Sequence, residues 1–124
     1  MGENTYSWNE VQKEVMQEAA EYLTRLIPAA EELKDEFCGE LKEDSYDYLN
    51  MVVEGLNWVI QVYNGTKDEI NSGTEQINSA EMDKKISAFG SAVISRNQQG
   101  IAKSLTEDVL PFLRKMKEIA DTAC

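Results

Sequence analysis

Residues 8–37, WNEVQKEVMQEAAEYLTRLIPAAEELKDEF, carry the pattern that decides the fold. Apolar side chains recur every three or four residues, which is the period of an α-helix with one buried face. The spacings follow the order three, four, four, and this 11-residue repeat predicts a nearly straight apolar stripe. The stripe consists of Trp8, Val11, Val15, Ala19, Tyr22, Leu26, Ala30, Leu33 and Phe37. We therefore expect one long helix from about Trp8 to Cys38, capped by Ser7 and ended by Gly39.

A proline at position 28 interrupts this stretch. Proline lacks a backbone donor and crowds the carbonyl group four residues before it, so it kinks or breaks a helix. The apolar stripe continues in phase across Pro28, from Leu26 to Ala30, and this favours a kink. The alternative is two helices, with Pro28 at the first position of the second one.

Three further helices are expected, over about residues 45–63, 79–95 and 98–122. Gly65 ends the first of these, a polar loop covers residues 65–78, and Pro111 lies inside the last helix. Four helices with short connections favour an antiparallel arrangement. The sequence thus predicts an all-α, antiparallel up-down four-helix bundle, with long, proline-kinked first and fourth helices, as a single domain over residues 1–124. The predicted core positions of the later helices are Leu49, Val52, Val53, Leu56, Val59, Ile60, Tyr63, Met82, Ile86, Phe89, Val93, Ile101, Leu105, Val109, Phe112, Met116 and Ile119 or Ala120.

Composition excludes several classes of function. The chain has 124 residues, 23 of them acidic and 12 basic, no histidine, and a net charge of -11. Without histidine there is no histidine-based catalytic triad and no Glu-x-x-His metal site in a bundle. A nucleic-acid site needs clustered Lys and Arg, so the charge argues against nucleic-acid partners. The acidity is uneven, since residues 1–54 hold 14 acidic and 4 basic residues whereas residues 55–124 hold 9 and 8.

The sequence shows no targeting or membrane segment. Its N-terminal residues lack the basic and apolar regions of a signal peptide. The uncharged stretch around Trp58, residues 55–66, is shorter than the ~20 residues of a membrane span. Cys38 and Cys124 are expected at opposite ends of the bundle, too far apart for a disulfide. We therefore expect a cytoplasmic protein with two free thiols, no membrane partner and no cofactor.

An acidic run covers the end of the first helix, the following loop and the start of the second helix. It consists of Glu31, Glu32, Asp35, Glu36, Glu40, Glu43, Asp44 and Asp47. Such a block of charge is usually a solvated surface. The alternatives are a docking patch for a basic partner and a divalent-cation site, although the Asp-x-Asp-x-Asp-Gly order of a calcium loop is absent.

The second helix also carries apolar residues outside its predicted core face. These are Met51, Gly55, Trp58 and Val62, spaced by four, three and four. The first helix repeats the pattern with Met16, Ala20, Leu23 and Ile27. Such flanks either pack on neighbouring helices within the bundle, form a surface for self-association or a partner helix, or line an aromatic ligand pocket. Tryptophan and methionine are enriched at protein–protein interfaces.

Three hypotheses of function follow from these features. The first is a non-enzymatic protein–protein interaction module that binds itself or a partner helix through Met51, Gly55, Trp58 and Val62. The alternative is an acidic chaperone or decoy that binds a basic client protein through the acidic run. The third is a carboxylate-based metal protein, but the predicted core stripes contain no Asp or Glu to form an interior site.

Three short segments resemble known sequences. The segment EGLNWVI over residues 54–60, and the segments IAKSL over 101–105 and LPFL over 110–113, resemble an uncharacterised group of small acidic bacterial helical-bundle proteins. The resemblance implies a helical bundle with no assigned activity. The chain is also similar, in size and helicity alone, to flagellar and secretion export chaperones, and such a likeness of fold implies no function.

Overall fold

The computed structural model describes residues 6 and 8–123, whose regular structure is entirely helical. The first helix, α1, spans Glu10–Cys38. A capping box closes its first turn: the Asn9 side chain accepts from the Gln12 backbone N–H at 2.8 Å, and the Gln12 side chain accepts from the Asn9 N–H at 3.1 Å. The observed cap is therefore Asn9, while the predicted cap, Ser7, lies outside the described residues.

Pro28 lies inside α1 without ending it. The helix is continuous across the proline, so the alternative of two separate helices is wrong. Leu26 and Ala30, on either side of Pro28, are both buried, and tertiary packing of this kind holds a helix together where local preference is poor. The kink at Pro28 stays a prediction, because continuity of the helix does not measure its bend.

The second helix, α2, spans Ser45–Ile70 and runs past its predicted end. The prediction that Gly65 ends this helix is wrong. Burial of two later residues explains the extension, since Thr66 is 5% and Ile70 1% exposed. The Thr66 hydroxyl also donates to the carbonyl of Val62 at 2.7 Å. Two more turns of helix thus add to the core, which outweighs the low helix preference of a single glycine.

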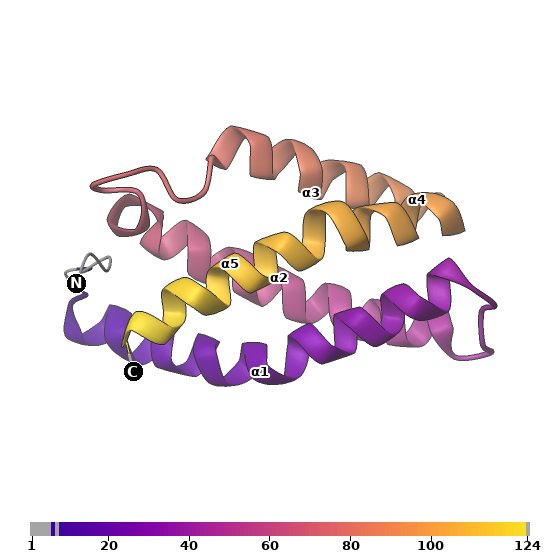
Figure 1. Ribbon diagram of the computed structural model, residues 1–124, viewed down its shortest axis with the longest axis horizontal. Coiled ribbons are helices and arrows are strands. Elements are labelled where there is room, and N and C mark those ends of the chain that lie inside the picture. The colour runs from indigo at the N-terminus through magenta and orange to yellow at the C-terminus, as the bar shows by residue number, and fades with distance from the viewer. Residues whose placement is uncertain (1–5, 7, 124) are drawn as a thin grey trace.

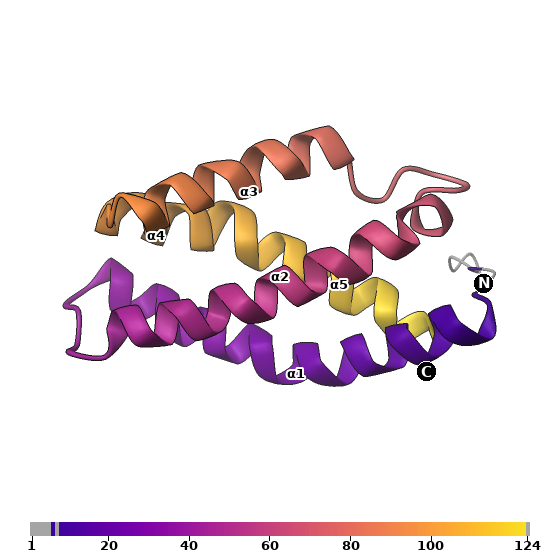
Figure 2. The same ribbon diagram turned by 180° about the vertical axis from the view of Figure 1, so that it is seen from behind.

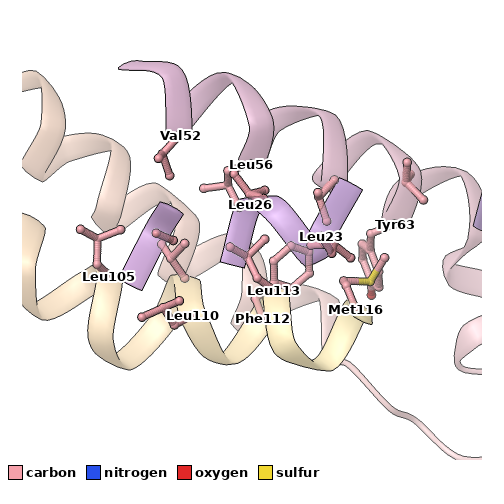
Figure 3. Close-up of a cluster of buried hydrophobic side chains, with 14 of the residues drawn as sticks. Leu23, Leu26, Val52, Leu56, Tyr63, Leu105, Leu110, Phe112, Leu113 and Met116 are labelled. Atoms are coloured by element: carbon pink, nitrogen blue, oxygen red, sulfur yellow. The ribbon is translucent and has the colours of Figure 1, made fainter. Parts of the chain in front are cut away.

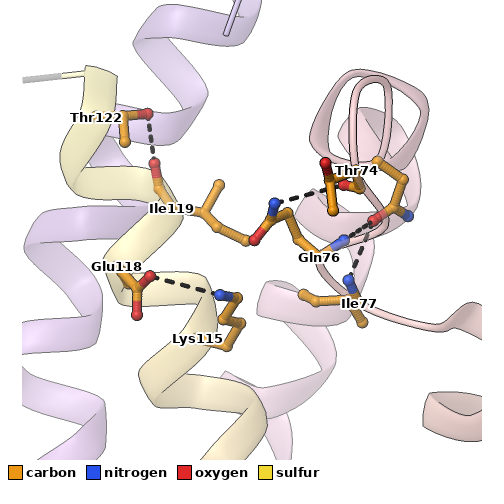
Figure 4. Close-up of polar contacts among 8 residues, drawn as sticks. Thr74, Gln76, Ile77, Lys115, Glu118, Ile119 and Thr122 are labelled. Carbon is orange, nitrogen blue, oxygen red and sulfur yellow. Dashed lines mark hydrogen bonds and ion pairs between the residues drawn. The ribbon is translucent and has the colours of Figure 1, made fainter. Parts of the chain in front are cut away.

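The loop after α2 begins at Asn71 and is held by that side chain. The side-chain oxygen of Asn71 accepts from the backbone N–H groups of Gln76, at 2.9 Å, and Ile77, at 3.1 Å (Figure 4). The third helix, α3, then spans Ser79–Ile94. Its cap is Asn78, whose side chain accepts from the Glu81 N–H at 2.8 Å. The bounds of α3 agree with the prediction.

The last helical rod is built from consecutive segments. These are α4 (Gln98–Ser104), the π-helical η1 (Leu105–Val109), α5 (Leu110–Ala120) and a final 3₁₀ turn, η2 (Asp121–Ala123). The π turn was not predicted. In it the Leu110 N–H donates to the carbonyl of Leu105, five residues back. The turn directly precedes Pro111, which has no N–H and crowds the carbonyl of Glu107. The wider turn thus occurs where the proline interrupts the regular hydrogen bonds of the α-helix. A kink at Pro111 also stays a prediction.

The helices alternate in direction, as an up-down bundle requires (Figures 1 and 2). α1 and α2 form an antiparallel pair, and α1 also packs along α4 and α5. α3 lies at the outside of the bundle and packs mainly on α4 and η1. The predicted fold class is therefore confirmed, with α3 as the least enclosed helix.

The core differs from the predicted stripe in the first half of α1. Val11 is 69% exposed, and Val15 and Tyr22 are only half-buried. The buried positions are instead Met16, Ala19, Ala20, Leu23, Leu26, Ala30, Leu33 and Phe37. Met16, Leu23, Ala30 and Phe37 are seven residues apart, and so are Ala19, Leu26 and Leu33. A seven-residue repeat is the pattern of helices that pack at a small crossing angle. The predicted stripe is thus wrong in the first half of α1, at Val11, Val15 and Tyr22, and confirmed from Leu26 to Phe37.

The other helices follow the prediction to different extents. Every predicted core residue of the last rod is buried. In α2 the predicted Val53 and Ile60 are only half-buried, and in α3 the same holds for Ile86 and Val93. Figure 3 shows the centre of the core, where Leu23 and Leu26 of α1 meet Leu56 of α2 and residues of α5 including Leu113.

Candidate functional site

Gly55 of α2 lies directly against two side chains of α1, those of Tyr22 and Leu26. A Cβ atom at this position would overlap the hydroxyl of Tyr22 and lie 2.9 Å from Cδ1 of Leu26. Only glycine lets the two helices pack here with Tyr22 laid across α2. The Tyr22 ring then meets Trp58 edge-on, with the ring centroids 5.3 Å apart. A glycine on one helix thus positions an aromatic pair that bridges both.

The structure separates the four residues predicted as one interface stripe on α2. Met51 is 56% exposed and Trp58 is half-buried, so both reach the surface. Gly55 is buried beneath Tyr22, and Val62 is only 7% exposed. These two therefore pack within the bundle, as the first of the three interpretations of the flanks predicts.

The flanking residues of α1 also pack inside. Met16 and Leu23 are fully buried and Ala20 is 5% exposed, while Ile27 is half-buried. They supply the first half of the seven-residue repeat. The apolar flank of α1 is thus explained by the core.

Two residues of α1 complete the surface around Met51 and Trp58. Tyr22 is half-buried, and the exposed guanidinium of Arg25 lies over its ring, 5.9 Å from the centroid. We call Tyr22, Arg25, Met51 and Trp58 the aromatic patch. The sequence did not single out Arg25, and it placed Tyr22 in the core. The only signal was their spacing of three residues, which puts them on one helix face.

Two shallow hollows adjoin the aromatic patch, and both are lined by Tyr22 and Arg25. The first hollow also includes Trp58 with Glu18 and Glu21. The second includes Met51 with Leu26, Val52 and Ala29. Tyr22 and Arg25 therefore lie between the two hollows, one on each side of them.

Most of the acidic run lies in solvent, but Glu36 does not. Glu36 is 9% exposed, and its carboxylate accepts a hydrogen bond from the Ser45 hydroxyl at 2.8 Å. Lys42 lies 3.7 Å from the same carboxylate, and its backbone N–H donates to the Ser45 hydroxyl at 2.8 Å. This network closes the turn between α1 and α2, so Glu36 is a structural residue. Nothing in the sequence indicated that Glu36 is buried.

Apart from Glu32, which contacts Tyr48, the remaining members of the run fall into two groups. Glu31 pairs with Arg114 of α5 at 2.7 Å, and Asp35 lies 3.3 Å from Lys34. The exposed carboxylates of Glu40, Glu43, Asp44 and Asp47 form no hydrogen bond or ion pair with any described side chain.

Tyr48 belongs to the same end of the bundle. Burial is the main cause that raises the pKa of Tyr48 to about 12. A hydrogen bond from its hydroxyl to the Glu32 carboxylate and the charges of Glu32 and Glu36 add to this effect. The phenol therefore links α2 to the acidic end of α1.

Other kinds of site receive little support from the geometry. Among residues 6 and 8–123, no three or more carboxylate or cysteine side chains gather in a way that would hold a metal ion. None of the described helices is long and apolar enough to cross a membrane. Cys38 is an exposed free thiol, and Cys124 lies outside the described residues. A groove of about 200 Å³ between the loop, α3 and α5, lined by Met82 and Phe112 among others, is smaller than usual ligand pockets.

Comparison with known proteins places the aromatic patch and the acidic run inside a shared domain. A family model described as Domain of unknown function (DUF8042) matches residues 14–119. No curated protein and no solved structure matches the chain.

Proposed function

Because this chain belongs to the DUF8042 family, whose description gives no function, we propose from its surface that it is a non-enzymatic protein–protein interaction module. The module binds a second copy of itself or a partner helix through the aromatic patch. Family membership also confirms the resemblance to a group without assigned activity. The proposal involves no chemical step and no cofactor.

One observation carries this proposal: an exposed patch joins a tryptophan, a tyrosine, an arginine and a methionine from two rigid helices. Trp, Tyr and Arg are the residue types that contribute most to binding at protein interfaces, and Met is enriched there. Met51 is one of only three large apolar side chains, among those described, that are strongly exposed. The other two, Val11 and Ile94, lie outside the patch, in the first turn of α1 and at the end of α3.

The substitution Trp58→Glu tests the proposal. We expect it to abolish association while the far-ultraviolet circular dichroism of the helices is retained, since Trp58 is not part of the central core. Asn57→Glu is the matched control, because it adds the same charge at an exposed neighbouring position of α2. Sedimentation and capture of binding proteins from lysate measure the association. A wild-type chain that stays monomeric at high concentration and captures no Trp58-dependent partner contradicts the proposal.

A second candidate function is an acidic chaperone or decoy for a basic client protein. It is favoured by the four exposed carboxylates of Glu40, Glu43, Asp44 and Asp47, which have no cationic partner among the described residues. Binding to a lysine-rich peptide is then expected to weaken steeply between low and moderate salt. Replacing the four by amides is expected to abolish that binding, and Trp58→Glu to leave it unchanged. Binding that is insensitive to salt contradicts this candidate.

A further inference from the structure

We propose that the partner of the aromatic patch is a second copy of this chain, docked face to face with the two α1 helices antiparallel about Tyr22. This inference rests on the proposed interaction function and specifies its partner. Both copies then use the same surface, as in most two-fold dimers.

The charges around the patch complement a second copy. Arg25 is exposed and makes no ion pair with any described residue, and exposed Glu18 and Glu21 beside it are equally unpaired. In an antiparallel pairing about Tyr22, Arg25 comes level with position 19 of the other copy. That level lies between Glu18 and Glu21, and symmetry forms the contact twice. A uniformly acidic or basic partner helix would instead place like charges together.

The relief of the patch fits the same arrangement. One hollow lies on the Trp58 side of Tyr22 and the other on the Met51 side. Reversing the second copy about Tyr22 places its Met51 side over the Trp58 side of the first. The exposed Met51 thioether then points toward the hollow beside Trp58, where sulfur–aromatic contact is favourable.

The uneven charge of the chain selects the antiparallel orientation. The acidic run lies at the turn between α1 and α2, at one end of the bundle (Figure 1). In a parallel pairing the two runs would lie side by side. In the antiparallel pairing residue 35 of one α1 is level with residue 9 of the other. At a rise of 1.5 Å per residue the two Asp35 positions are about 39 Å apart, far beyond the Debye length of ~8 Å at physiological salt.

Charge exchange tests this arrangement on the full chain by sedimentation at ~0.15 M salt. Arg25→Glu alone, and Glu18→Arg with Glu21→Arg in one chain, each place like charges together twice. We expect each variant to raise the dimer dissociation constant by about tenfold or more. An equimolar mixture of the two variants restores opposite charges at both contacts, so we expect a mixed dimer of near wild-type affinity. All three positions are exposed, and circular dichroism verifies the fold.

Lys13→Glu is the matched control for Arg25→Glu. It makes the same change of charge at an exposed site nine residues before Tyr22, which at 100° per residue is the opposite side of α1. We expect it to leave the dimer intact. An equal loss with Lys13→Glu, or no recovery in the mixture, overturns the proposal.

The outcome also separates this inference from the proposed function. If the wild-type chain is monomeric but binds another protein in a Trp58-dependent way, the second copy is wrong and the interaction function stands. If the chain is monomeric and no Trp58-dependent partner exists, both fail.

Discussion

The α1–α2 pair and α3 are all amphipathic helices, yet the bundle encloses them very differently. α1 contacts α2 on one side and α4 and α5 on the other, whereas α3 packs mainly on α4 and η1. As a result α1 buries nine residues and α2 ten, but α3 buries only Met82, Phe89 and Ala92. Ile94, at the end of α3, is 87% exposed.

An apolar period therefore does not determine how much of a helix is buried. Burial depends on how many neighbours a helix has, and this is set by topology. A helix with one main neighbour contributes less hydrophobic free energy and is expected to open more easily than the rest.

The largest expected effect compares equivalent truncations in the two regions. Leu56→Ala on α2 removes a side chain that is 2% exposed, and we expect the free energy of unfolding to fall by about 2–5 kcal/mol. Ile86→Ala on α3 removes a half-buried side chain, and we expect a fall of about 1 kcal/mol. Urea unfolding followed by circular dichroism measures both. Equal losses would contradict the view that α3 is the less enclosed helix.

Replacing one glycine in each region by alanine is expected to change the free energy of unfolding in opposite directions. Gly55→Ala introduces a Cβ that displaces Tyr22 and Leu26, and we expect a net loss of about 1 kcal/mol. Gly90→Ala on α3 meets no atom within 4 Å, and we expect a gain of about 0.5–1 kcal/mol from helix propensity. Thermal unfolding measures both changes. A gain in stability for Gly55→Ala would show that α1 and α2 do not need a glycine at their contact.

The sequence predicted the last rod and the fold class well, and α1 and α2 less well. In the last rod the whole predicted stripe is buried, and Leu110 and Leu113, which lie outside that stripe, are buried as well. In the first half of α1 two adjacent stripes are apolar, and periodicity alone does not tell which one meets the neighbour. In the structure the stripe with Met16 and Leu23 is buried, and Val11 is 69% exposed. Similarly, Gly65 was predicted to end α2, because the burial of Ile70 that extends the helix depends on tertiary contacts and is not visible in local sequence.

Two of the four residues of the aromatic patch, Met51 and Trp58, were singled out from the sequence. Met51 and Trp58 stood out because apolar side chains off a core face are informative in sequence. Tyr22 and Arg25 did not, since their proximity to Trp58 depends on the register of α1 against α2. In that register Gly55 packs against Tyr22 and Leu26, whereas the sequence left open whether Gly55 faces a neighbouring helix or the surface.

The smallest expected effect concerns a polar contact within the α1–α2 pair, between Tyr48 and Glu32. Burial and the Glu32 carboxylate raise the pKa of Tyr48 to about 12. Alkaline titration followed by tyrosinate absorbance is expected to show the ionisation of Tyr48 near pH 12. This step is expected to be absent in the Tyr48→Phe variant. Glu32→Gln is expected to lower the pKa of Tyr48, because it removes a charged acceptor.

The sign of the effect on stability follows from linkage. The folded-state pKa of Tyr48 lies above the value of about 10 in the unfolded chain, so its contribution is complete below pH ~10 and is lost as pH rises toward ~12. The pKa of Tyr6 is also raised, by burial first and then by Glu118 and Glu69, so part of the alkaline loss persists in Tyr48→Phe. If Tyr48→Phe leaves the alkaline loss of stability entirely unchanged, Tyr48 is solvated and does not link α2 to α1.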